Sequence, residues 1–332
     1  MVTAKDVAAR AGTSTAVVSY VFNDGPRGVA PETRERVLRA ADELNYRPNV
    51  LARALSFGRT LSVGLIVPDI ANRFFGELAR ALEEVVAEHG NILLIGDSSQ
   101  RVEREREHIA AFVGRRVDSV VVVSVSDDPD LSAFADAGIP VAALHPLPES
   151  VAASSISIDY RAAAASATRH LLEHGYRSLA LFNGPTESAG SRQHRDGFQD
   201  AVREIAPDAA VEEHSTRIAR AHAAQVALDM LARPSRPRAV YCATDEQAYG
   251  VLFACHRLGL RVPEDVAVTG FDGTEHSAYS YPPLTTVRQP LREMAERAIA
   301  LLSSGREPVR EIVDFTLAIR ESCGPHGAGA RG

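Results

Sequence analysis

The sequence predicts an α/β protein in two parts: an N-terminal all-α helix-turn-helix headpiece and a two-lobed core built on doubly wound parallel sheets. Two observations predict this division. The first 45 or so residues read as three short helices, whereas from Leu61 onward short apolar segments alternate with amphipathic helices. The 332 residues, 45 % of them hydrophobic, provide for a small module and two lobes of roughly 100–150 residues each.

The first two helices have the spacing of a helix-turn-helix unit. A helix is expected over 5–11, and Gly12 ends it because glycine adopts the left-handed conformation of a tight turn. Thr13 or Ser14 can cap a second helix that runs to about Phe22. One face of this helix is apolar, and the other consists of Thr15, Ala16, Ser19 and Tyr20. Such a helix can lie in a DNA major groove, although an ordinary three-helix domain would have the same spacing.

The third helix is expected to begin at Pro31, since proline is favoured in a first turn, and to run to about Asn45. Ala30 stands where Ser or Thr would cap this helix, which costs about 1 kcal/mol of helix stability. Pro48 ends the helical pattern. The stretch 50–56 is compatible with a helix but too short to be stable alone, so we expect it to fold on contact with DNA or a partner subunit.

The core shows the alternation of a parallel sheet protein. Strands are expected at 62–67, 91–96, 119–125, 141–144, 155–158, 178–182, 239–243 and 266–269. Helices are expected, among others, at 74–89, 101–115, 161–174, 191–205, 219–232 and 246–258. In doubly wound sheets, ligands bind at the carboxyl ends of the strands. No run of about 18 apolar residues occurs, so we expect no membrane partner.

Charge is distributed unevenly along the chain. The net charge is −7, yet residues 1–59 contain nine Lys or Arg and six Asp or Glu, so that segment carries +3 and the remainder −10. A basic end on an acidic body is expected when only that end contacts phosphate.

The cysteines and the N-terminus argue for a reducing compartment. Cys242, Cys255 and Cys323 are odd in number and lack a CxxC motif, so the sequence suggests neither a disulfide framework nor a zinc site. We predict no cofactor and no metal. Met1 leads directly into a polar, helix-forming run without the apolar segment of a secretion signal, which favours a cytoplasmic location.

Ordered sequence motifs occur along most of the chain. In the N-terminal part they are VTAKDVAARAGTS at 2–14, Val18-Ser19, Asn23, PETRERV at 31–37, NYRPN at 45–49 and ARAL at 52–55. Beyond it they are GLIVPDIAN at 64–72, HLL at 170–172, NGP at 183–185, Thr244-Asp245, VPEDVAV at 262–268, GFD at 270–272, PPLTTV at 282–287 and RES at 320–322. Together these motifs resemble those of the lac repressor family of bacterial transcriptional regulators.

The resemblance implies a headpiece over 1–46, a hinge helix and linker over 47–60, and an effector-binding, dimerising core over 61–332 shaped like periplasmic sugar-binding proteins. It implies a sequence-specific DNA-binding transcriptional regulator of the repressor type, which binds a near-palindromic operator as a homodimer. A small-molecule effector, a sugar or sugar derivative, is expected to modulate that binding. The glycine-rich tail has no heptad pattern, so we expect no tetramerising helix.

The resemblance also assigns DNA-facing residues. Thr15, Ala16 and Tyr20 would read base edges, but Tyr20 stands where the family usually has Arg, so the usual operator bases cannot be assumed. Leu55, close to Ala52, would enter the minor groove and open a base step; the alternative is a plain linker residue. Arg34, Arg47, Arg53 and Arg59 are candidates to contact phosphate; the alternative for each is a solvated surface charge. The full expected set is Thr3, Lys5, Ser14, Thr15, Ala16, Ser19, Tyr20, Asn23, Arg34, Tyr46, Asn49, Ala52, Arg53 and Leu55.

For the ligand cleft the resemblance places Phe74 and Phe75 at an apolar wall, with Asp272 and Gln289 as polar contacts, an arrangement suited to a polyhydroxylated ring. A turn-forming role is the alternative for Asp272. His194 replaces the family's ligand-binding Arg, and two imidazoles in one cleft could instead favour an acidic or phosphorylated ligand or be purely structural. The full expected set is Phe74, Phe75, His145, Arg192, His194, Thr244, Asp272 and Gln289.

Two other classes of protein fit the sequence less well. A secreted solute-binding protein of the same core fold would need a signal segment and no headpiece. An enzyme would need a catalytic motif, and neither GxSxG, a phosphate-binding loop nor HExxH occurs. We therefore predict no catalytic activity. The sequence does not decide whether the ligand releases DNA or promotes its binding.

Overall fold

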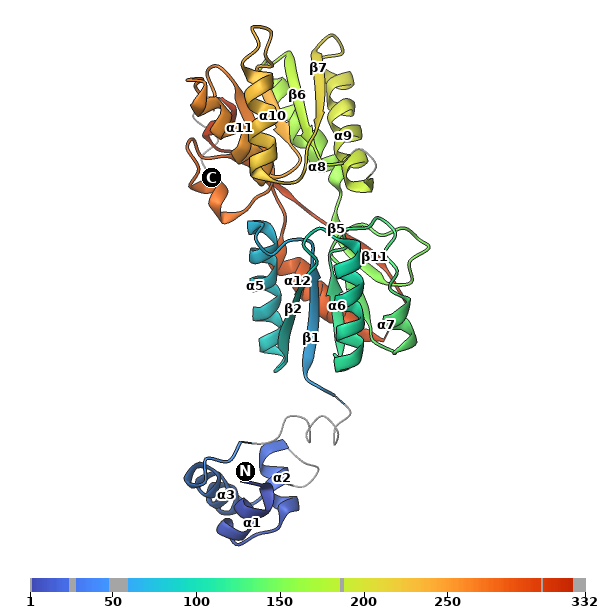
Figure 1. The fold of residues 1–332 in the computed structure, drawn as a ribbon, viewed down its shortest axis with the longest axis vertical. Coiled ribbons are helices and arrows are strands. Elements are labelled where there is room, and N and C mark those ends of the chain that lie inside the picture. Colours follow the sequence, from blue (N-terminus) through green and yellow to red (C-terminus); the bar gives the residue numbers. More distant parts are fainter. Residues whose placement is uncertain (1, 24–27, 48–58, 186–187, 306, 325–332) are drawn as a thin grey trace. The chain divides into compact units, whose positions relative to one another are not determined.

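The computed structural model describes residues 2–23, 28–47, 59–185, 188–305 and 307–324 (Figure 1). The chain forms two compact units, Met1–Ser62 and Val63–Gly332, each with a hydrophobic core of its own. Within the described residues, no helix combines the length and the apolar character needed to span a membrane.

The first unit is a three-helix headpiece, as predicted. Its helices are α1 (Ala4–Ala11), α2 (Thr15–Asn23) and α3 (Pro31–Glu43), and they enclose a small core that includes Val7, Val18, Val21 and Val37. Gly12 ends α1 at a φ of 62°. Ser14 Oγ accepts a hydrogen bond from Val17 N at 3.3 Å and so caps α2. The predicted end of α3 at Asn45 is late, because Asn45 already has a φ of 50°.

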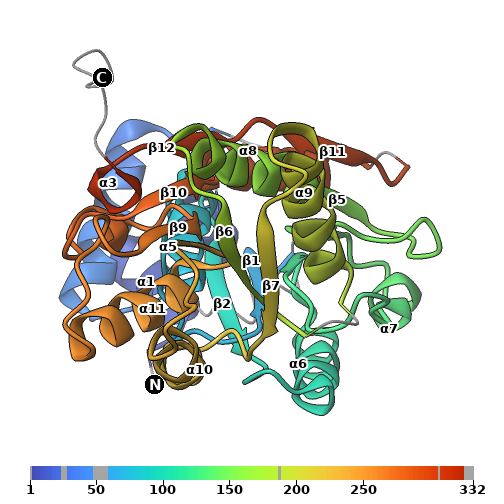
Figure 2. The same ribbon diagram turned by 90° about the horizontal axis from the view of Figure 1, so that it is seen from above.

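The second unit contains two six-stranded sheets, each the centre of one lobe (Figures 1 and 2). Lobe 1 has the strand order β11-β5-β4-β3-β1-β2, with β1 (Ser62–Val67), β2 (Ile92–Asp97), β3 (Ser119–Val122), β4 (Val141–Ala143), β5 (Ser154–Ile158) and β11 (Arg310–Val313). Its helices are α5 (Arg73–Glu88), α6 (Val102–Arg115), α7 (Ser132–Asp136) and α12 (Leu291–Ser304). Helices α5 and α12 pack on the face of Leu65 and Val121, and α6 and α7 on that of Ile66 and Val122.

Lobe 2 repeats this architecture. Its strand order is β12-β10-β9-β8-β6-β7, with β6 (Ser178–Asn183), β7 (Ala210–Ser215), β8 (Ala239–Cys242), β9 (Ala267–Asp272), β10 (Thr285–Arg288) and β12 (Thr316–Ala318). Helices α8 (Tyr160–Glu173) and α9 (Ala189–Ile205) cover one face, and α10 (Arg220–Leu231) and α11 (Asp245–Arg257) the other. Two short 3-10 helices, η1 (Glu275–Ala278) and η2 (Glu321–Cys323), complete the lobe.

The chain passes between the lobes three times: from β5 to α8, from β10 to α12, and from β11 to β12. The carboxyl ends of β5 and β10 therefore lead directly into the segments that join the lobes. Residues at these crossings are therefore candidates to respond to a ligand bound between the lobes.

Four strands were missed by the sequence prediction: β7, β10, β11 and β12. They are short, or polar on one face as in AVEEHS of β7, and so lack the apolar runs of the central strands. The register of β10 with β12 is antiparallel, whereas β10 pairs with β9 in parallel, so the second sheet is not wholly parallel. The predicted strand 119–125 ends earlier, at Val122.

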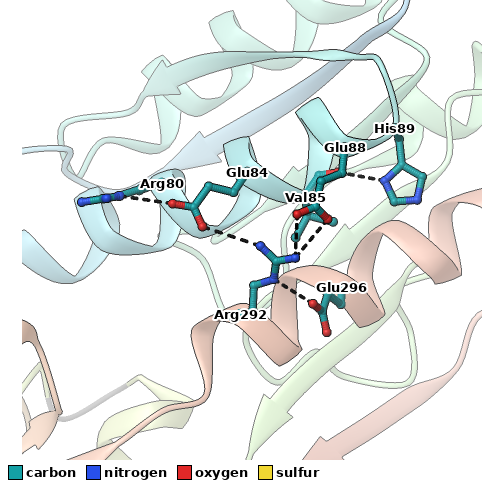
Figure 3. Close-up of polar contacts among 7 residues, drawn as sticks. All are labelled: Arg80, Glu84, Val85, Glu88, His89, Arg292 and Glu296. Carbon is teal, nitrogen blue, oxygen red and sulfur yellow. Dashed lines mark hydrogen bonds and ion pairs between the residues drawn. The ribbon is translucent and has the colours of Figure 1, made fainter.

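Helix α12 returns to lobe 1 after the second crossing and packs beside α5. An ion-pair network on the surface joins the two helices: Arg292 contacts Glu88 at 2.9 Å and Glu84 at 3.6 Å, and Glu296 on its own helix at 2.7 Å (Figure 3). Because these side chains are about half exposed, each pair contributes little stability. The apolar side of α12, which includes Met294 and Ile299, stabilises the contact more.

Candidate functional site

The exposed face of α2 is the candidate DNA-reading surface. Thr15, Ala16 and Ser19 are exposed and Tyr20 is half-buried, while Val18 on the opposite side is buried in the headpiece core. The structure thus brings four of the predicted DNA-facing residues onto one helix face, where side chains can reach base edges.

The remaining predicted DNA-facing residues lie around this helix. Thr3 and Ser14 lie at the N-termini of α1 and α2, whose backbone N–H groups favour phosphate. Lys5 and Arg34 are exposed. The ring of Tyr46 packs edge-on against Phe22 with centroids 5.8 Å apart, so at least part of Tyr46 serves the headpiece core. Asn49, Ala52, Arg53 and Leu55 lie outside the described residues, as does the side chain of Asn23.

The second candidate site is a cavity of about 270 Å³ within the core unit. It lies at the carboxyl ends of strands from both sheets, between lobe 1 and lobe 2. Seven of the eight predicted ligand-binding residues line it: Phe74, Phe75, His145, His194, Thr244, Asp272 and Gln289. A cavity at this place in a doubly wound fold is the expected position for a small ligand.

Arg192 is the predicted residue that does not line the cavity. It shares α9 with Ser191 and His194, which are buried and do line it, and one residue along a helix turns the side chain by about 100°. The side chain of Arg192 is instead half exposed and pairs with the Asp127 carboxylate at 3.5 Å.

Aromatic rings form the walls of the cavity. On lobe 1, Phe74 and Phe75 meet edge to face with ring centroids 5.2 Å apart. On lobe 2, the rings of His194 and Phe271 are 4.6 Å apart, and Tyr160 lies 5.5 Å from Phe271. Flat apolar surfaces of this kind suit the ring face of a ligand.

The polar groups of the cavity include buried atoms without partners. Gln289 Nε2 donates to Asp272 Oδ1 at 3.2 Å, while Gln289 Oε1 has no hydrogen-bond partner among the described residues. Asp272 has a φ of 118°, a conformation that only glycine adopts without strain. Burial and the nearby Asp245 carboxylate raise the pKa of Asp272 well above its usual value. An amide oxygen without a hydrogen-bond partner and a carboxyl carried on a strained backbone, in one cavity, are typical of a binding site.

Both cavity histidines are neutral near pH 7. Burial lowers the pKa of His145 to about 4, only partly opposed by the Val122 carbonyl and the Asp127 carboxylate. Neither ring nitrogen of His145 has a hydrogen-bond partner of acceptable geometry in the described part of the chain. His194 Nδ1 lies 2.6 Å from the Tyr241 hydroxyl, and burial lowers the pKa of His194 to about 3. His145 can therefore offer a ligand one donor and one acceptor nitrogen, whereas His194 can offer only Nε2, and neither ring carries a charge.

Folding stability should depend on pH through His194. Its folded pKa of about 3 lies below the unfolded value of 6.5, so its contribution is complete above pH 6.5 and is lost as the pH falls toward 3. Between pH 7.5 and 5.0 we expect the wild type to lose about 2 kcal/mol more than His194→Gln. Urea unfolding at pH 7.5 and 5.0 measures this difference. Exposed His256→Gln is the control, and equal pH dependence in all three proteins would contradict the assignment.

Two carboxylates of lobe 1 bridge to lobe 2 beside the cavity. Asp127 Oδ2 accepts from the backbone N–H of Ala189, at the start of α9, at 2.5 Å. Glu77 accepts from the backbone N–H of Glu275 at 3.0 and 3.2 Å, and its partial burial raises its pKa. Both contacts must break if the lobes move apart, so they hold the arrangement seen here.

Sequence reasoning missed several residues of the cavity. Tyr160, Asn183, Asp127 and Phe271 were not predicted to bind a ligand, yet all line it. Asn183 and Phe271 lie within recognised motifs, at or just before a strand end, so a rule that examines every strand end would have found them. Asp127 follows a strand whose end was placed three residues late, and no signal in the sequence marked it.

The headpiece and the two-lobed core together define a DNA-binding transcriptional regulator with a ligand cavity in its core. The family of bacterial regulatory proteins called lacI matches residues 3–49, and the periplasmic binding protein-like domain matches residues 168–323. The HTH-type transcriptional repressor PurR of Vibrio vulnificus (strain CMCP6) is 34 % identical over 305 residues, 91 % of each chain. The chain belongs to the lacI family of bacterial regulatory proteins.

Solved structures agree with this assignment. A lac repressor dimer bound to operator and the anti-inducer ONPF has a TM-score of 0.84 and 25 % identity, covering 98 % of this chain and 99 % of that one. A complex of the transcriptional regulator CelR with cellobiose has a TM-score of 0.70 and 28 % identity, covering 97 % and 100 %. The predicted fold class, with its helix-turn-helix headpiece and periplasmic-binding-protein-like core, is confirmed.

Proposed function

We propose that this protein represses transcription as a homodimer on a near-palindromic operator, and that an uncharged sugar in the cavity between the lobes changes its affinity for that operator. The observation that carries the ligand proposal is the cavity itself. It combines aromatic walls with the unpartnered Gln289 Oε1, the unpartnered His145 nitrogens and the strained Asp272. Sugar hydroxyls would satisfy these buried groups while the ring face packs on the aromatic side chains.

The charge of the cavity favours an uncharged ligand over an acidic or phosphorylated one. Its lining residues include no Lys or Arg among those described. The two imidazoles do not replace such charges, because burial keeps both neutral near pH 7. A phosphate would need charged donors to offset its desolvation. The cellobiose complex of CelR supports a sugar as the ligand class.

For DNA we propose that Thr15, Ala16, Ser19 and Tyr20 contact bases, and that Thr3, Lys5, Ser14 and Arg34 contact the phosphate backbone. The exposure of these side chains supports their access to DNA, except that Tyr20 is half-buried. Asn23, Tyr46, Asn49, Ala52, Arg53 and Leu55 remain predictions from the family resemblance.

We also retain the expected organisation: headpiece 1–46, hinge and linker 47–60, effector-binding and dimerisation core 61–332. The proposed protein acts in the cytoplasm and has no catalytic activity. Ligand binding would change how the lobes meet at their three crossings and so alter operator affinity, a coupling of about 1–3 kcal/mol.

The test has a DNA arm and a ligand arm. Purified protein is mixed with fragments of its own genomic DNA, and retained fragments are sequenced, with Tyr20→Ala and Leu55→Ala in parallel. We expect one near-palindromic site that both substitutions weaken. If the protein retains no preferred DNA sequence, with or without added sugars, the proposal that it binds an operator is contradicted.

The ligand arm measures melting temperature with neutral mono- and disaccharides, including cellobiose, and with matched sugar phosphates. We expect a neutral sugar to raise the melting temperature and to change operator affinity by about 5- to 150-fold. Stabilisation by sugar phosphates alone would contradict the uncharged ligand.

A further inference from the structure

Three metal-ligating side chains meet at the C-terminal end of α8, and none of them lines the cavity. His170 and His174 are one helical turn apart, and Cys323 comes from η2 near the end of the described chain. One ligand atom of each lies within 4.8 Å of the others. His170 Nε2 is 3.1 Å from Cys323 Sγ, and the two imidazole centroids are 4.7 Å apart.

The three ligand types suit one class of metal ion. Two imidazole nitrogens and one thiolate sulfur are the ligands that Zn²⁺ selects, and a helix that carries His at i and i+4 presents both rings on the same side. Zinc bonds are about 2.0–2.1 Å to nitrogen and 2.3 Å to sulfur. Ligand atoms already within 4.8 Å of each other need only small side-chain rotations to surround one ion.

The surroundings fit a bound ion. Cys323 is fully buried and both histidines are partly buried, so the ion would be shielded on one side and accessible on the other. The Thr285 hydroxyl lies 2.9 Å from Cys323 Sγ and can donate to a thiolate, orienting it as an outer ligand group does. Gly324 lies directly beside the His174 ring. A Cβ at position 324 would be 3.1 Å from His174 Nδ1, and the φ of 131° at this position also favours glycine.

We propose that His170, His174 and Cys323 bind one zinc-class divalent cation, with a fourth position open to water. On binding, the Cys323 thiol gives up its proton to solvent and becomes the thiolate ligand. The ion would tie η2 to α8. Because Ser322 Oγ donates to Val268 O at 2.6 Å and accepts from Thr285 N at 2.8 Å, this tie would also fix η2 against strands β9 and β10.

The spacing of the cysteines in the sequence did not predict a metal site. The prediction of no metal rested on the absence of CxxC motifs, whereas this cluster joins residues separated by 153 positions in the chain. Among the described residues it is the one group of three such side chains close enough to share an ion.

Full-length protein without a polyhistidine tag, reduced and stripped with a chelator, is titrated with Zn²⁺ and with Co²⁺. We expect one ion per chain, a raised melting temperature, and for Co²⁺ a thiolate-to-metal charge-transfer band in the near ultraviolet. The band reports the sulfur ligand directly and does not depend on any variant.

His170→Gln and His174→Gln should each weaken Zn²⁺ binding at least about tenfold. Exposed His256→Gln on α11 is the control for adventitious surface binding and should bind as the wild type does. Circular dichroism of the metal-stripped variants verifies that they fold. Absence of the charge-transfer band, or zinc affinity unchanged in both α8 variants, would overturn the proposal.

Discussion

Gly197→Ala is expected to destabilise lobe 2 by about 2–3 kcal/mol and to lower its melting temperature by about 5–10 °C. Gly197 lies on α9 where this helix crosses α8 at close range. A Cβ at this position would lie 2.1 Å from the Arg161 carbonyl oxygen and 3.0 Å from Ala164 Cβ. The first contact is with backbone, which cannot rotate away, so the two helices must separate. The gain in helix propensity from Ala, about 1 kcal/mol, offsets only part of this cost.

Urea unfolding followed by circular dichroism measures the effect. Gly114→Ala is a matched control, because Gly114 is an exposed residue of α6 where an added Cβ would meet no described neighbour within 4 Å. The control should be neutral or slightly stabilising. Sugar affinity should also fall in Gly197→Ala, since α8 and α9 contribute Tyr160 and His194 to the cavity. Equal stability of the two variants would show that α8 and α9 are not packed this closely.

The fold could be predicted from the sequence wherever one signal dominated. Central strands such as β1 and β6 are continuous apolar runs, and helices such as α5 and α9 have a clear apolar face, so their predicted bounds lie within two residues of the observed ones. The edge strands β7, β11 and β12 have no such signal, because one or both of their faces contact solvent. Their pairing depends on a sheet assembled from distant segments, which local pattern does not reveal.

The candidate cavity shows the same limit. Strand-end positions and the family resemblance placed Phe74, Asp272 and Gln289 together, as the structure does. Arg192 was predicted to line the cavity because it lies close to His194 in the sequence. The rotation between adjacent residues of a helix directs its side chain away from the cavity instead. The backbone strain at Asp272 is likewise invisible in the sequence, because it arises only when β9 ends against its neighbours.

Asp272→Gly and Asp272→Ala should lose sugar binding to the same extent but differ in stability. Both remove the buried carboxyl and its 3.2 Å contact with Gln289, so we expect affinity for a stabilising sugar to fall about 10- to 100-fold in each. Only Gly relieves the conformation at φ 118°, since Ala keeps the clash of its Cβ with the backbone. Strain of about 1–3 kcal/mol, less the entropy cost of Gly, should make the Gly variant about 1–2 kcal/mol more stable than the Ala variant.

Comparing the Gly and Ala variants separates the ligand contact of Asp272 from its backbone strain, which a single substitution would not do. Isothermal titration with the sugar that raises the wild-type melting temperature gives the affinity, and urea unfolding gives the stability. Unchanged affinity in both variants would show that Asp272 does not contact the ligand. Equal stability of the two variants would show that the backbone at position 272 is not strained. If both expectations hold, the protein maintains an unfavourable backbone conformation because it places a carboxyl where the ligand needs it. Operator binding should then persist in the Gly variant and respond only at about 10- to 100-fold higher sugar concentration, since only the ligand contact has been weakened.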